Sequence, residues 1–314
     1  MTKPIGVVGA GLVGSGWAIV FARAGREVRV FDSEARTLET LPDRLRANLQ
    51  DLAGFELIDN PDEVFARISV VDQLADAVGD VDYVQESVFE RTDVKRAIYE
   101  KLDDVVGPDT VVGSSSSGIP ASEFTDGLVH RANYLVVHPV NPPYLVPVVE
   151  IVPAPWTSEA AVEKATRLMD SVGQVPVQVR REVSGFVLNR LQGALLREAW
   201  ALYEEGYASL EDIDKTVSAG LGRRWSFMGP FETIDMNAPG GIRDYAERLG
   251  GLYLDIARER ADPQPWSKEL IAKAEAERRA ALPLDDLGKR SQWRDRRLMA
   301  LSAHMAGRLA VEGK

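Results

Sequence analysis

The feature that most constrains the fold is a cluster of glycines near the start of the chain, Gly9-Ala10-Gly11-Leu12-Val13-Gly14, which fits the pattern G-x-G-x-x-G. In a strand–turn–helix unit the first glycine permits the tight turn, the second leaves room for a pyrophosphate, and the third lets the helix pack closely on the strand. Free N–H groups at the start of that helix attract the same anion. We therefore predict a dinucleotide site formed by Gly9, Gly11, Leu12, Val13 and Gly14.

The residues around the glycine cluster strengthen this interpretation. An apolar strand, Ile5 to Val8, comes before it, a helix from Leu12 to Ala24 follows, and a second strand runs from Glu27 to Phe31. Asp32, at the end of that strand, lies 23 positions after Gly9. A carboxylate there binds the ribose hydroxyls of NAD and repels the 2′-phosphate of NADP, so we predict NAD. Two alternatives remain: FAD uses the same kind of loop, and a glycine-rich turn followed by a chance aspartate would bind neither.

Apolar β-branched segments alternate with helical patterns through the first half of the chain, which is typical of parallel βαβ units. Further strands are expected at residues 68–71, 83–85, 111–112, 134–137, 148–152 and 175–179, with helices over 34–52 and 91–106. From Ser184, the expected N-cap, the pattern is helical, with later helices at 210–219, 242–260, 266–281 and 287–309. The fold class is therefore α/β: a Rossmann-type doubly wound sheet in residues 1–182, followed by an all-helical C-terminal domain in residues 183–314.

The composition excludes several classes of function. A formal net charge of −11 argues against nucleic acid or an anionic membrane as a partner, since binding phosphates takes clustered Lys and Arg. With no cysteine, the chain has no disulfide, thiolate zinc site, iron–sulfur cluster or cysteine nucleophile, and we expect no metal site. The uncharged segment Ile5 to Ala22 is almost long enough for a membrane helix, but its five glycines indicate a buried strand, turn and helix. A cytoplasmic location is expected.

Only three histidines are present, and one of them occupies a position suited to catalysis. His138 follows the strand at 134–137, which Pro139 is expected to end, so the imidazole should lie at the carboxyl edge of the sheet, where α/β enzymes place their ligands. Glu150, twelve residues later on the next strand, could orient the ring and stabilise the imidazolium when His138 accepts a proton. A hydrogen-bonded structural histidine is the alternative on these residues alone.

The segment that contains both residues resembles a known family. The run His138-Pro139-Val140-Asn141-Pro142-Pro143-Tyr144, continued by Pro147-Val148-Val149-Glu150, is similar to the signature segment of the 3-hydroxyacyl-CoA dehydrogenase superfamily. It is most similar to the lambda-crystallin branch, whose enzymatic member is L-gulonate 3-dehydrogenase. The resemblance extends in order over four further segments: Ser114–Ser117, Gly185–Leu191, Gly229–Thr233 and Gln292–Asp295. It therefore covers essentially the whole chain and is highly specific.

The family pattern implies a role for each matching residue. The catalytic set is His138 as general base, Glu150 as its partner, and Ser117 and Asn189 as hydrogen-bonding partners of the substrate. The cofactor set is Asn141, at the nicotinamide end, with Glu90 and Lys95. Within the serine tract Ser116 competes with Ser117, whose spacing of 21 from His138 favours it, and the tract could also be a plain polar loop. Lys95 is equally compatible with a solvated helix.

The resemblance implies oxidation of an L-3-hydroxy acid by NAD⁺ to the 3-oxo acid, NADH and a proton. A free carboxylate needs a cation, and Arg224, which matches the arginine of the L-gulonate branch, is expected to bind it in a bidentate manner. An exposed arginine in a loop is the alternative.

Three other functions stay open. Carnitine dehydrogenase would need an aromatic cage, which the available aromatic residues do not exclude: Tyr144, Trp225, Phe227 and Phe231. Short-chain 3-hydroxyacyl-CoA dehydrogenase is disfavoured, because residues 53–67 supply only Arg67 as a cation for the CoA phosphates. A non-catalytic crystallin-like role is disfavoured because His138, Glu150 and Asn189 are intact.

The expected partners are a small-molecule substrate and a second copy of the chain. Dimerisation is implied by the resemblance, which assigns it to the helical domain together with closure of the substrate cleft. The apolar stripe Val187, Leu191, Leu195 and Ala199 is compatible with a dimer interface and equally with an intramolecular core.

Overall fold

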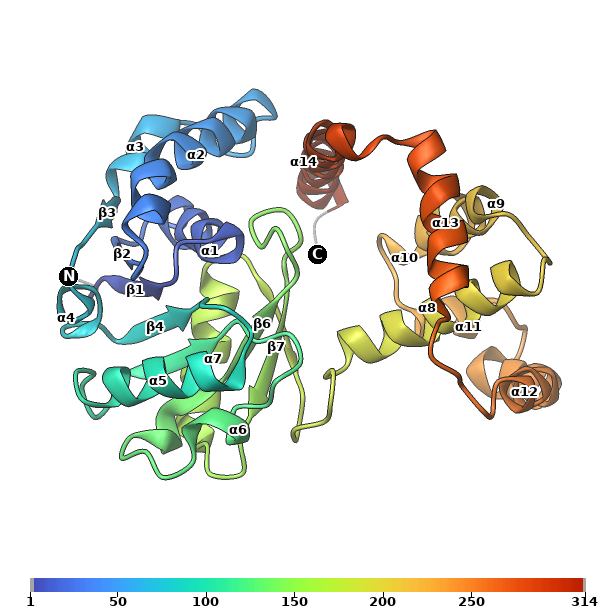
Figure 1. Cartoon of the computed structure of the whole chain (residues 1–314), viewed down its shortest axis with the longest axis horizontal. Helices are drawn as coiled ribbons and strands as arrows, with labels where there is room; N and C mark the ends of the chain where they lie inside the picture. The colour runs from blue at the N-terminus through green and yellow to red at the C-terminus, as the bar shows by residue number, and fades with distance from the viewer. Residues whose placement is uncertain (1–2, 313–314) are drawn as a thin grey trace. The chain divides into compact units, whose positions relative to one another are not determined.

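The computed structural model describes residues 3–312, with side chains described as far as residue 307. The chain forms two compact units, shown in Figure 1. The first runs to Arg190 and also takes in the chain from Lys289 onward, and the second is Leu191–Gly288.

The first unit is built on an eight-stranded sheet in the order β3-β2-β1-β4-β5-β6-β7-β8. Its strands are β1 (Ile5–Val8), β2 (Val28–Phe31), β3 (Ile68–Val70), β4 (Tyr83–Glu86), β5 (Val111–Ser114), β6 (Tyr134–Pro139), β7 (Val148–Pro153) and β8 (Val175–Gln178). The strands from β3 to β6 pair in parallel, which confirms the Rossmann-type sheet, but β7 is antiparallel to β6. Eight residues separate β6 from β7, too few for the crossover that a parallel pair requires.

Helices cover both faces of this sheet. They are α1 (Leu12–Arg23), α2 (Ala35–Gly54), α3 (Pro61–Ala66), α4 (Leu74–Val78), α5 (Thr92–Asp103), α6 (Ser122–Thr125), α7 (Glu159–Ser171) and α14 (Leu287–Glu312). Helix α7 is not among the elements expected from the sequence. Ser158 caps it by accepting a hydrogen bond from the N–H of Ala161, and Ala161, Ala165 and Met169 bury one side of it at helical spacing.

Side chains alternate between the two faces of the sheet, and each face has its own apolar core. Leu135 and Val137 of β6 join one cluster with residues of α1, α2, α7 and α14. Tyr134 and Val136 join the other cluster, with residues of α4, α5 and α6. His138 continues the second series, so the alternation places its side chain on the same face as Tyr134 and Val136.

The last helix, α14, belongs to the first unit. Met299 is buried in the cluster that α1 and α7 form on their face of the sheet, and Leu298 packs against that cluster. The second domain expected from the sequence, residues 183–314, would include α14. In the structure the buried side chains of α14 pack with the first unit. Nothing in the local sequence pattern of an amphipathic helix specifies which core it joins, since that choice is made by tertiary contacts.

Residues 191–288 form the helical second unit, which follows the sequence expectation of an all-helical region. Its helices are α8 (Leu188–Glu204), α9 (Leu210–Lys215), a π-helical turn (Thr216–Leu221), α10 (Gly222–Trp225), α11 (Pro230–Met236), α12 (Gly241–Glu259), α13 (Lys268–Ala281) and a 3₁₀ turn (Leu284–Asp286). The buried members of its apolar core cluster are Tyr203, Leu270 and Ala274. Beside them Trp200 stacks on Trp266 with 4.9 Å between ring centroids.

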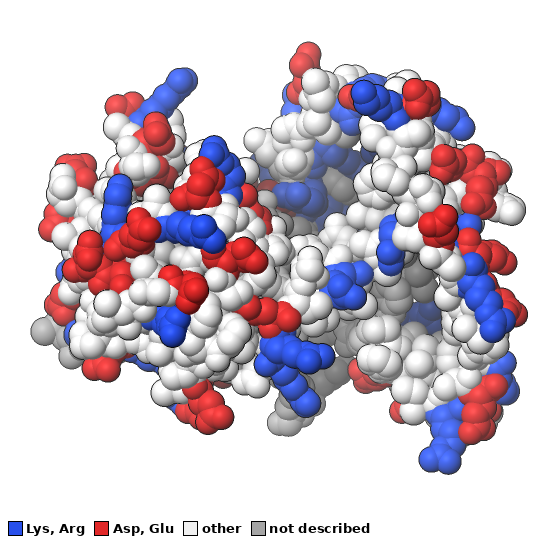
Figure 2. Space-filling view, turned by 60° about the horizontal axis from the view of Figure 1, so that its bottom comes forward, with Lys and Arg blue, Asp and Glu red and all other residues white. Residues whose placement is uncertain are grey.

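The surface carries charges of both signs. Figure 2 shows basic and acidic side chains interspersed over the visible face. None of the helices within residues 3–312 combines the length and the apolar composition needed to cross a membrane.

Candidate active site

The glycine loop after β1 has the geometry that its pattern predicts. Gly9 has a φ of +97°, and a Cβ built there would lie 2.6 Å from the carbonyl oxygen of Ser87. A Cβ on Gly14 would lie 1.8 Å from the carbonyl oxygen of Gly9, so α1 packs directly on the loop. A Cβ on Gly11 would meet no atom within 4 Å. Gly11 therefore faces open space, as an approaching pyrophosphate would require.

A cavity of about 840 Å³ adjoins the loop and is large enough for a cofactor. Gly9, Gly11, Leu12, Val13 and Asp32 line it, as expected from the sequence. Asp32 accepts hydrogen bonds from the backbone N–H of Ala10 at 2.7 Å and of Glu34 at 2.9 Å. A carboxylate has further lone pairs for ribose hydroxyls. The residues present thus fit a dinucleotide without a 2′-phosphate, because Asp32 would repel one.

His138 and Glu150 are brought together by the antiparallel ladder between β6 and β7, in which they are paired directly. The distance between His138 Nδ1 and Glu150 Oε2 is 2.8 Å, and the two residues are 6% and 2% exposed. Strand β6 ends at Pro139, but it runs two residues beyond the expected bound at Val137, so His138 lies within the strand and does not follow it. Strand β5 pairs with β6 only as far as Val136, so Pro139 is at an edge where its missing N–H is tolerated.

The other oxygen of Glu150 holds the start of α8. Oε1 accepts hydrogen bonds from the backbone N–H of Val187 at 2.8 Å and of Leu188 at 3.0 Å. Burial raises the pKa of Glu150, but the hydrogen bonds from His138 and from these two N–H groups outweigh it and leave the pKa below its ordinary value. The carboxylate therefore stays ionised at neutral pH, and its stabilising contribution is lost only as the pH falls through that lowered pKa.

The ionised Glu150 determines the tautomer of His138. A carboxylate can only accept a hydrogen bond, so Nδ1 of a neutral His138 carries the proton and Nε2 keeps its lone pair. Nε2 has no hydrogen-bond partner among the residues that the structure describes. The ring packs beside Phe186, with 5.8 Å between ring centroids. His138 is thus held by Glu150 through Nδ1, with Nε2 unpaired among the described residues.

The segment before α8 has a backbone that the sequence pattern did not reveal. Gly185 and Phe186 have φ values of +73° and +48°, a left-handed conformation that is unusual for a phenylalanine. Because of this turn α8 begins at Leu188, and the expectation of Ser184 as its N-cap is wrong. The turn aims the N–H groups of residues 187 and 188 at Glu150 and buries the Phe186 ring against His138.

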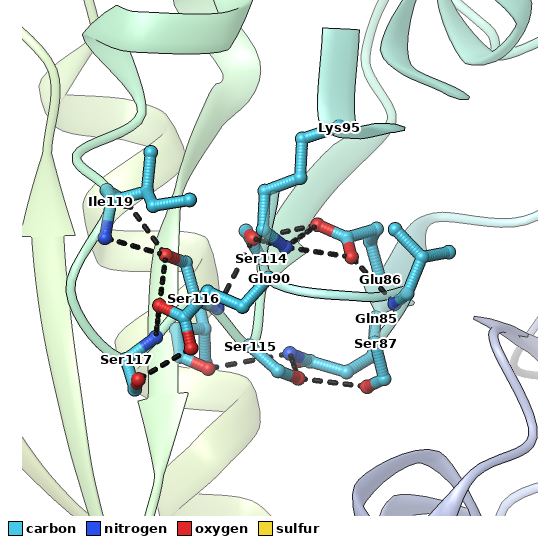
Figure 3. Close-up of polar contacts among 12 residues, drawn as sticks. Gln85, Glu86, Ser87, Glu90, Lys95, Ser114, Ser115, Ser116, Ser117 and Ile119 are labelled. Atoms are coloured by element: carbon cyan, nitrogen blue, oxygen red, sulfur yellow. Dashed lines mark hydrogen bonds and ion pairs between the residues drawn. The ribbon is translucent and has the colours of Figure 1, made fainter. Parts of the chain in front are cut away.

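Ser117, Glu90 and Asn189 meet beside this turn. Figure 3 shows the Glu90 carboxylate accepting hydrogen bonds from the N–H and the hydroxyl of Ser117, and the N–H of Gly118 donates to it at 2.7 Å as well. Asn189 Nδ2 donates to the Ser117 carbonyl oxygen at 2.7 Å. Burial raises the pKa of Glu90, but the hydrogen bonds that Ser117 and the N–H of Gly118 donate to it outweigh this effect and leave the pKa below its ordinary value.

The two candidate serines differ in what their hydroxyls contact. Ser116 is buried, and its hydroxyl donates to the carbonyl oxygen of Ile119 at 2.7 Å. Ser117 is half-buried and is joined to Asn189 through its backbone, so the geometry favours Ser117 as the residue that could meet a ligand.

Lys95 requires a correction. Its side chain is 1% exposed, its Nζ lies 2.9 Å from both oxygens of Glu86, and it donates to Ser114 Oγ at 3.1 Å (Figure 3). It is therefore not on a solvated helix face, and it does not line the cofactor cavity. The reason is that Glu86, at the end of β4, points toward α5, and a buried carboxylate needs a cation. A glutamate at the end of a strand whose residues are all buried is the sequence feature that could have indicated this pair.

Two further residues expected in the site are exposed. Asn141 is exposed on the loop after β6, next to a cis peptide bond to Pro142. Arg224 is exposed on α10 in the second unit. Among the described residues no group of three or more His, Cys, Asp or Glu side chains could hold a metal ion.

Comparisons with known proteins agree with this geometry. Residues 4–183 match the model of the 3-hydroxyacyl-CoA dehydrogenase NAD binding domain, and residues 185–283 match that of the C-terminal domain. The chain is 38% identical to lambda-crystallin of Oryctolagus cuniculus over 301 residues, and this alignment covers 94% of each of the two chains. It is 34% identical over 245 residues to an L-carnitine dehydrogenase/betainyl-CoA thioesterase of Ruegeria pomeroyi, covering 78% of this chain and 50% of that one. Among solved structures, 5-formyl-3-hydroxy-2-methylpyridine 4-carboxylic acid 5-dehydrogenase, an NAD⁺-dependent dismutase, has a TM-score of 0.75 at 28% identity over all of both chains.

The glycine loop offers a matched pair of variants. Gly11→Ala should leave the free energy of unfolding unchanged and raise the Kd for NADH roughly tenfold, because the new methyl meets only the space that the pyrophosphate needs. Gly14→Ala should lower the free energy of unfolding by about 1–3 kcal/mol, because its methyl meets backbone. Urea denaturation and fluorescence titration with NADH measure the two effects. Wild-type NADH affinity in Gly11→Ala would contradict this assignment.

Proposed function

As a member of the 3-hydroxyacyl-CoA dehydrogenase family the chain is an NAD-dependent dehydrogenase, and we propose that its substrate is a small L-3-hydroxy acid with a free carboxylate, such as L-gulonate. The reaction converts the secondary alcohol and NAD⁺ into the 3-oxo acid, NADH and a proton. The observation that carries the proposal is the buried pair of His138 and Glu150, in which Nε2 of the histidine has no hydrogen-bond partner among the residues whose side chains are described.

In this proposal His138 Nε2 takes the proton of the 3-hydroxyl group. Glu150 holds Nδ1 and stabilises the imidazolium that forms, because it is ionised and 2.8 Å away. Ser117 and Asn189, which the hydrogen bond between them keeps together, would bind the substrate oxygen. NAD⁺ supplies the hydride acceptor when bound. Asn141 and Glu90 are the further residues that we assign to the cofactor.

His138→Gln tests the base. Loss of the lone pair on Nε2 should lower kcat by a factor of about 10² or more, with the Kd for NADH unchanged. His130→Gln is the matched control, since His130 is a histidine of the same unit outside this site, and it should keep wild-type kcat. Stopped-flow or steady-state absorbance at 340 nm gives the rates. Unchanged turnover in His138→Gln would remove the assignment of the base.

The preference for a free acid over a CoA thioester has two supports. Arg67, the one cation that residues 53–67 offer, is already bound to Glu63 and to the carbonyl oxygen of Ala22, so it is not available to CoA phosphates. Arg224, in contrast, is exposed and makes no side-chain hydrogen bond or ion pair among the described residues. We assign it to the substrate carboxylate, which a guanidinium binds in a bidentate manner. The structural neighbour with an NAD⁺-dependent reaction on a pyridine carboxylic acid is compatible with such a substrate.

Arg224→Met and Arg223→Met form the test of the carboxylate contact. Both side chains are exposed on α10, so neither change should unfold the protein. Arg224→Met should raise KM for the free hydroxy acid about tenfold or more, as expected for loss of a charge-assisted pair, while Arg223→Met changes it little. Equal effects of the two variants, or an unchanged KM in Arg224→Met, would show that Arg224 does not bind the carboxylate.

L-Carnitine is the second candidate substrate. It is favoured by the 34% identity to an L-carnitine dehydrogenase/betainyl-CoA thioesterase and by three exposed aromatic side chains close to Arg224 in sequence, Trp225, Phe227 and Phe231. Aromatic faces are what a trimethylammonium group requires. NADH formation with L-gulonate, L-carnitine, 3-hydroxybutyrate and 3-hydroxybutyryl-CoA decides between the candidates. A non-catalytic crystallin-like protein would form NADH with none of them.

We also propose that the protein is a homodimer formed through the helical second unit. Large apolar side chains are exposed on this unit, among them Leu191 at 61%, Leu195, Leu252 and Tyr253. Exposed apolar surface of this extent on an enzyme is typical of a subunit interface. Light scattering should give a mass of about 69 kDa, twice the 34.5 kDa of the chain, and Leu191→Glu should shift it toward the monomer. A wild-type mass of one chain at micromolar concentration would contradict the dimer.

A further inference from the structure

The hydroxyl of Ser115, directly after β5, has three polar partners. The indole N–H of Trp17 on α1 donates to Ser115 Oγ at 3.1 Å. The side-chain amide of Gln85 on β4 lies 2.9 Å away, and the hydroxyl of Ser87 lies 2.8 Å away (Figure 3). Neither Ser87 nor Ser115 has a task in the function proposed above.

The orientation of the Gln85 amide follows from its two other neighbours. The carbonyl oxygen of Val137, 3.3 Å away, can only accept, so the atom that faces it is Nε2. On the other side the hydroxyl of Tyr83 is 2.6 Å from Oε1. Burial raises the pKa of Tyr83 well above its ordinary value, so this hydroxyl stays protonated and donates to Oε1. Gln85 Nε2 is therefore the group that meets Ser115, and it donates.

These assignments determine the direction of the hydrogen bond between the two serines. A hydroxyl has one hydrogen to donate and two lone pairs that accept. Trp17 Nε1 and Gln85 Nε2 can only donate, so they occupy both lone pairs of Ser115 Oγ. The single hydrogen of Ser115 then goes to Ser87 Oγ. The hydroxyl hydrogen of Ser87 is therefore available to another acceptor, because Ser87 Oγ makes no other hydrogen bond among the residues whose side chains are described.

Ser87 lies beside the position that the bound dinucleotide would occupy. It follows β4, which lies between β1 and β5 in the sheet, and it lines the cavity together with Gly9 and Gly11. Asp32, which we assign to the adenosine ribose, follows β2 on the other side of β1. Ser87 and Asp32 therefore lie on opposite sides of the glycine loop. Ser87 lies on the side of β6, the strand that carries His138.

We propose that the Ser87 hydroxyl donates a hydrogen bond to an oxygen of the nicotinamide half of the dinucleotide, either in the pyrophosphate or in the second ribose, and that Ser115 sets its direction as a positioning residue. The same network reaches β6 through the hydrogen bond from Gln85 to the Val137 carbonyl oxygen, one residue before His138. The hydroxyl that meets the cofactor and the strand that carries the base are thus held by one side chain, Gln85.

Calorimetric titration of Ser87→Ala with AMP, ADP, ADP-ribose and NADH tests the contact without any turnover. Affinity for ADP-ribose and NADH should fall about tenfold, the effect of one lost hydrogen bond, while affinity for AMP stays within about twofold of wild type. Weaker ADP binding as well would place the acceptor in the pyrophosphate, and unchanged ADP binding would place it in the second ribose. Ser87→Cys, of similar size and with a weak donor, should resemble Ser87→Ala.

The control is Ser171→Ala at the exposed end of α7, which should bind all four nucleotides as wild type does. Two results overturn the contact: wild-type NADH affinity in Ser87→Ala, or a loss for AMP as large as that for NADH, which would mean that the whole loop has moved. Since these titrations use no hydroxy acid, their outcome is independent of the substrate proposed above.

A double-mutant cycle tests the role of Ser115. Ser115→Ala should weaken NADH binding roughly threefold in the wild-type background and leave it unchanged in the Ser87→Ala background, because its effect passes through the Ser87 hydroxyl. An equal loss in both backgrounds would overturn this positioning role. If Ser115→Ala does not fold, Ser115→Thr replaces it. This variant keeps the hydroxyl and should bind NADH within about twofold of wild type. A loss of NADH affinity in Ser115→Thr that persists in the Ser87→Ala background would overturn the positioning role in the same way.

Discussion

The carboxylate of Glu150 is the interaction on which the rest of the site depends. It is buried, so each oxygen must find donors, and it finds them in two different parts of the chain: His138 on the neighbouring strand and the N–H groups of Val187 and Leu188. One side fixes the tautomer of the histidine. The other anchors the turn from which Asn189 reaches Ser117. Loss of this one negative charge would release both at once.

The other residues of the candidate site lie along the carboxyl edge of the sheet. In the spatial order β2, β1, β4, β5 and β6, the residues at or just after the carboxyl ends of these strands are Asp32, the glycine loop, Ser87, Ser115 and His138. Side-chain alternation divides each strand end between two faces. Thus Gln85 donates to Ser115, which Trp17 on α1 also contacts, whereas Glu86 binds Lys95 on α5 and ties that helix to the sheet. Two adjacent residues of β4 therefore make polar contacts on opposite faces of the sheet.

The parts that could be predicted from the sequence are those set by local pattern. The glycine loop, Asp32 and the βαβ order follow from spacing alone, and the fold class is confirmed. The burial of Lys95 could not be read from its own helix, because its partner comes from a strand nine residues earlier. The start of α8 was misplaced for a related reason: the left-handed backbone at Phe186 is imposed by its burial against His138 and not by a residue type that favours it.

The two units differ in how completely each buries its own apolar surface, and this bears on specificity. The first unit encloses an apolar cluster on each face of its sheet, and hydride transfer depends on groups held within that rigid frame. The second unit has a cluster of only a few buried residues and leaves large side chains such as Leu252 exposed within its described surface. Arg224 belongs to this second unit, on the short helix α10. Under the proposal that Arg224 binds the substrate carboxylate, changes in the second unit alter the group recognised at the far end of the substrate without disturbing His138 or the glycine loop. Such a separation is compatible with similar proteins whose names specify carnitine or a pyridine carboxylic acid.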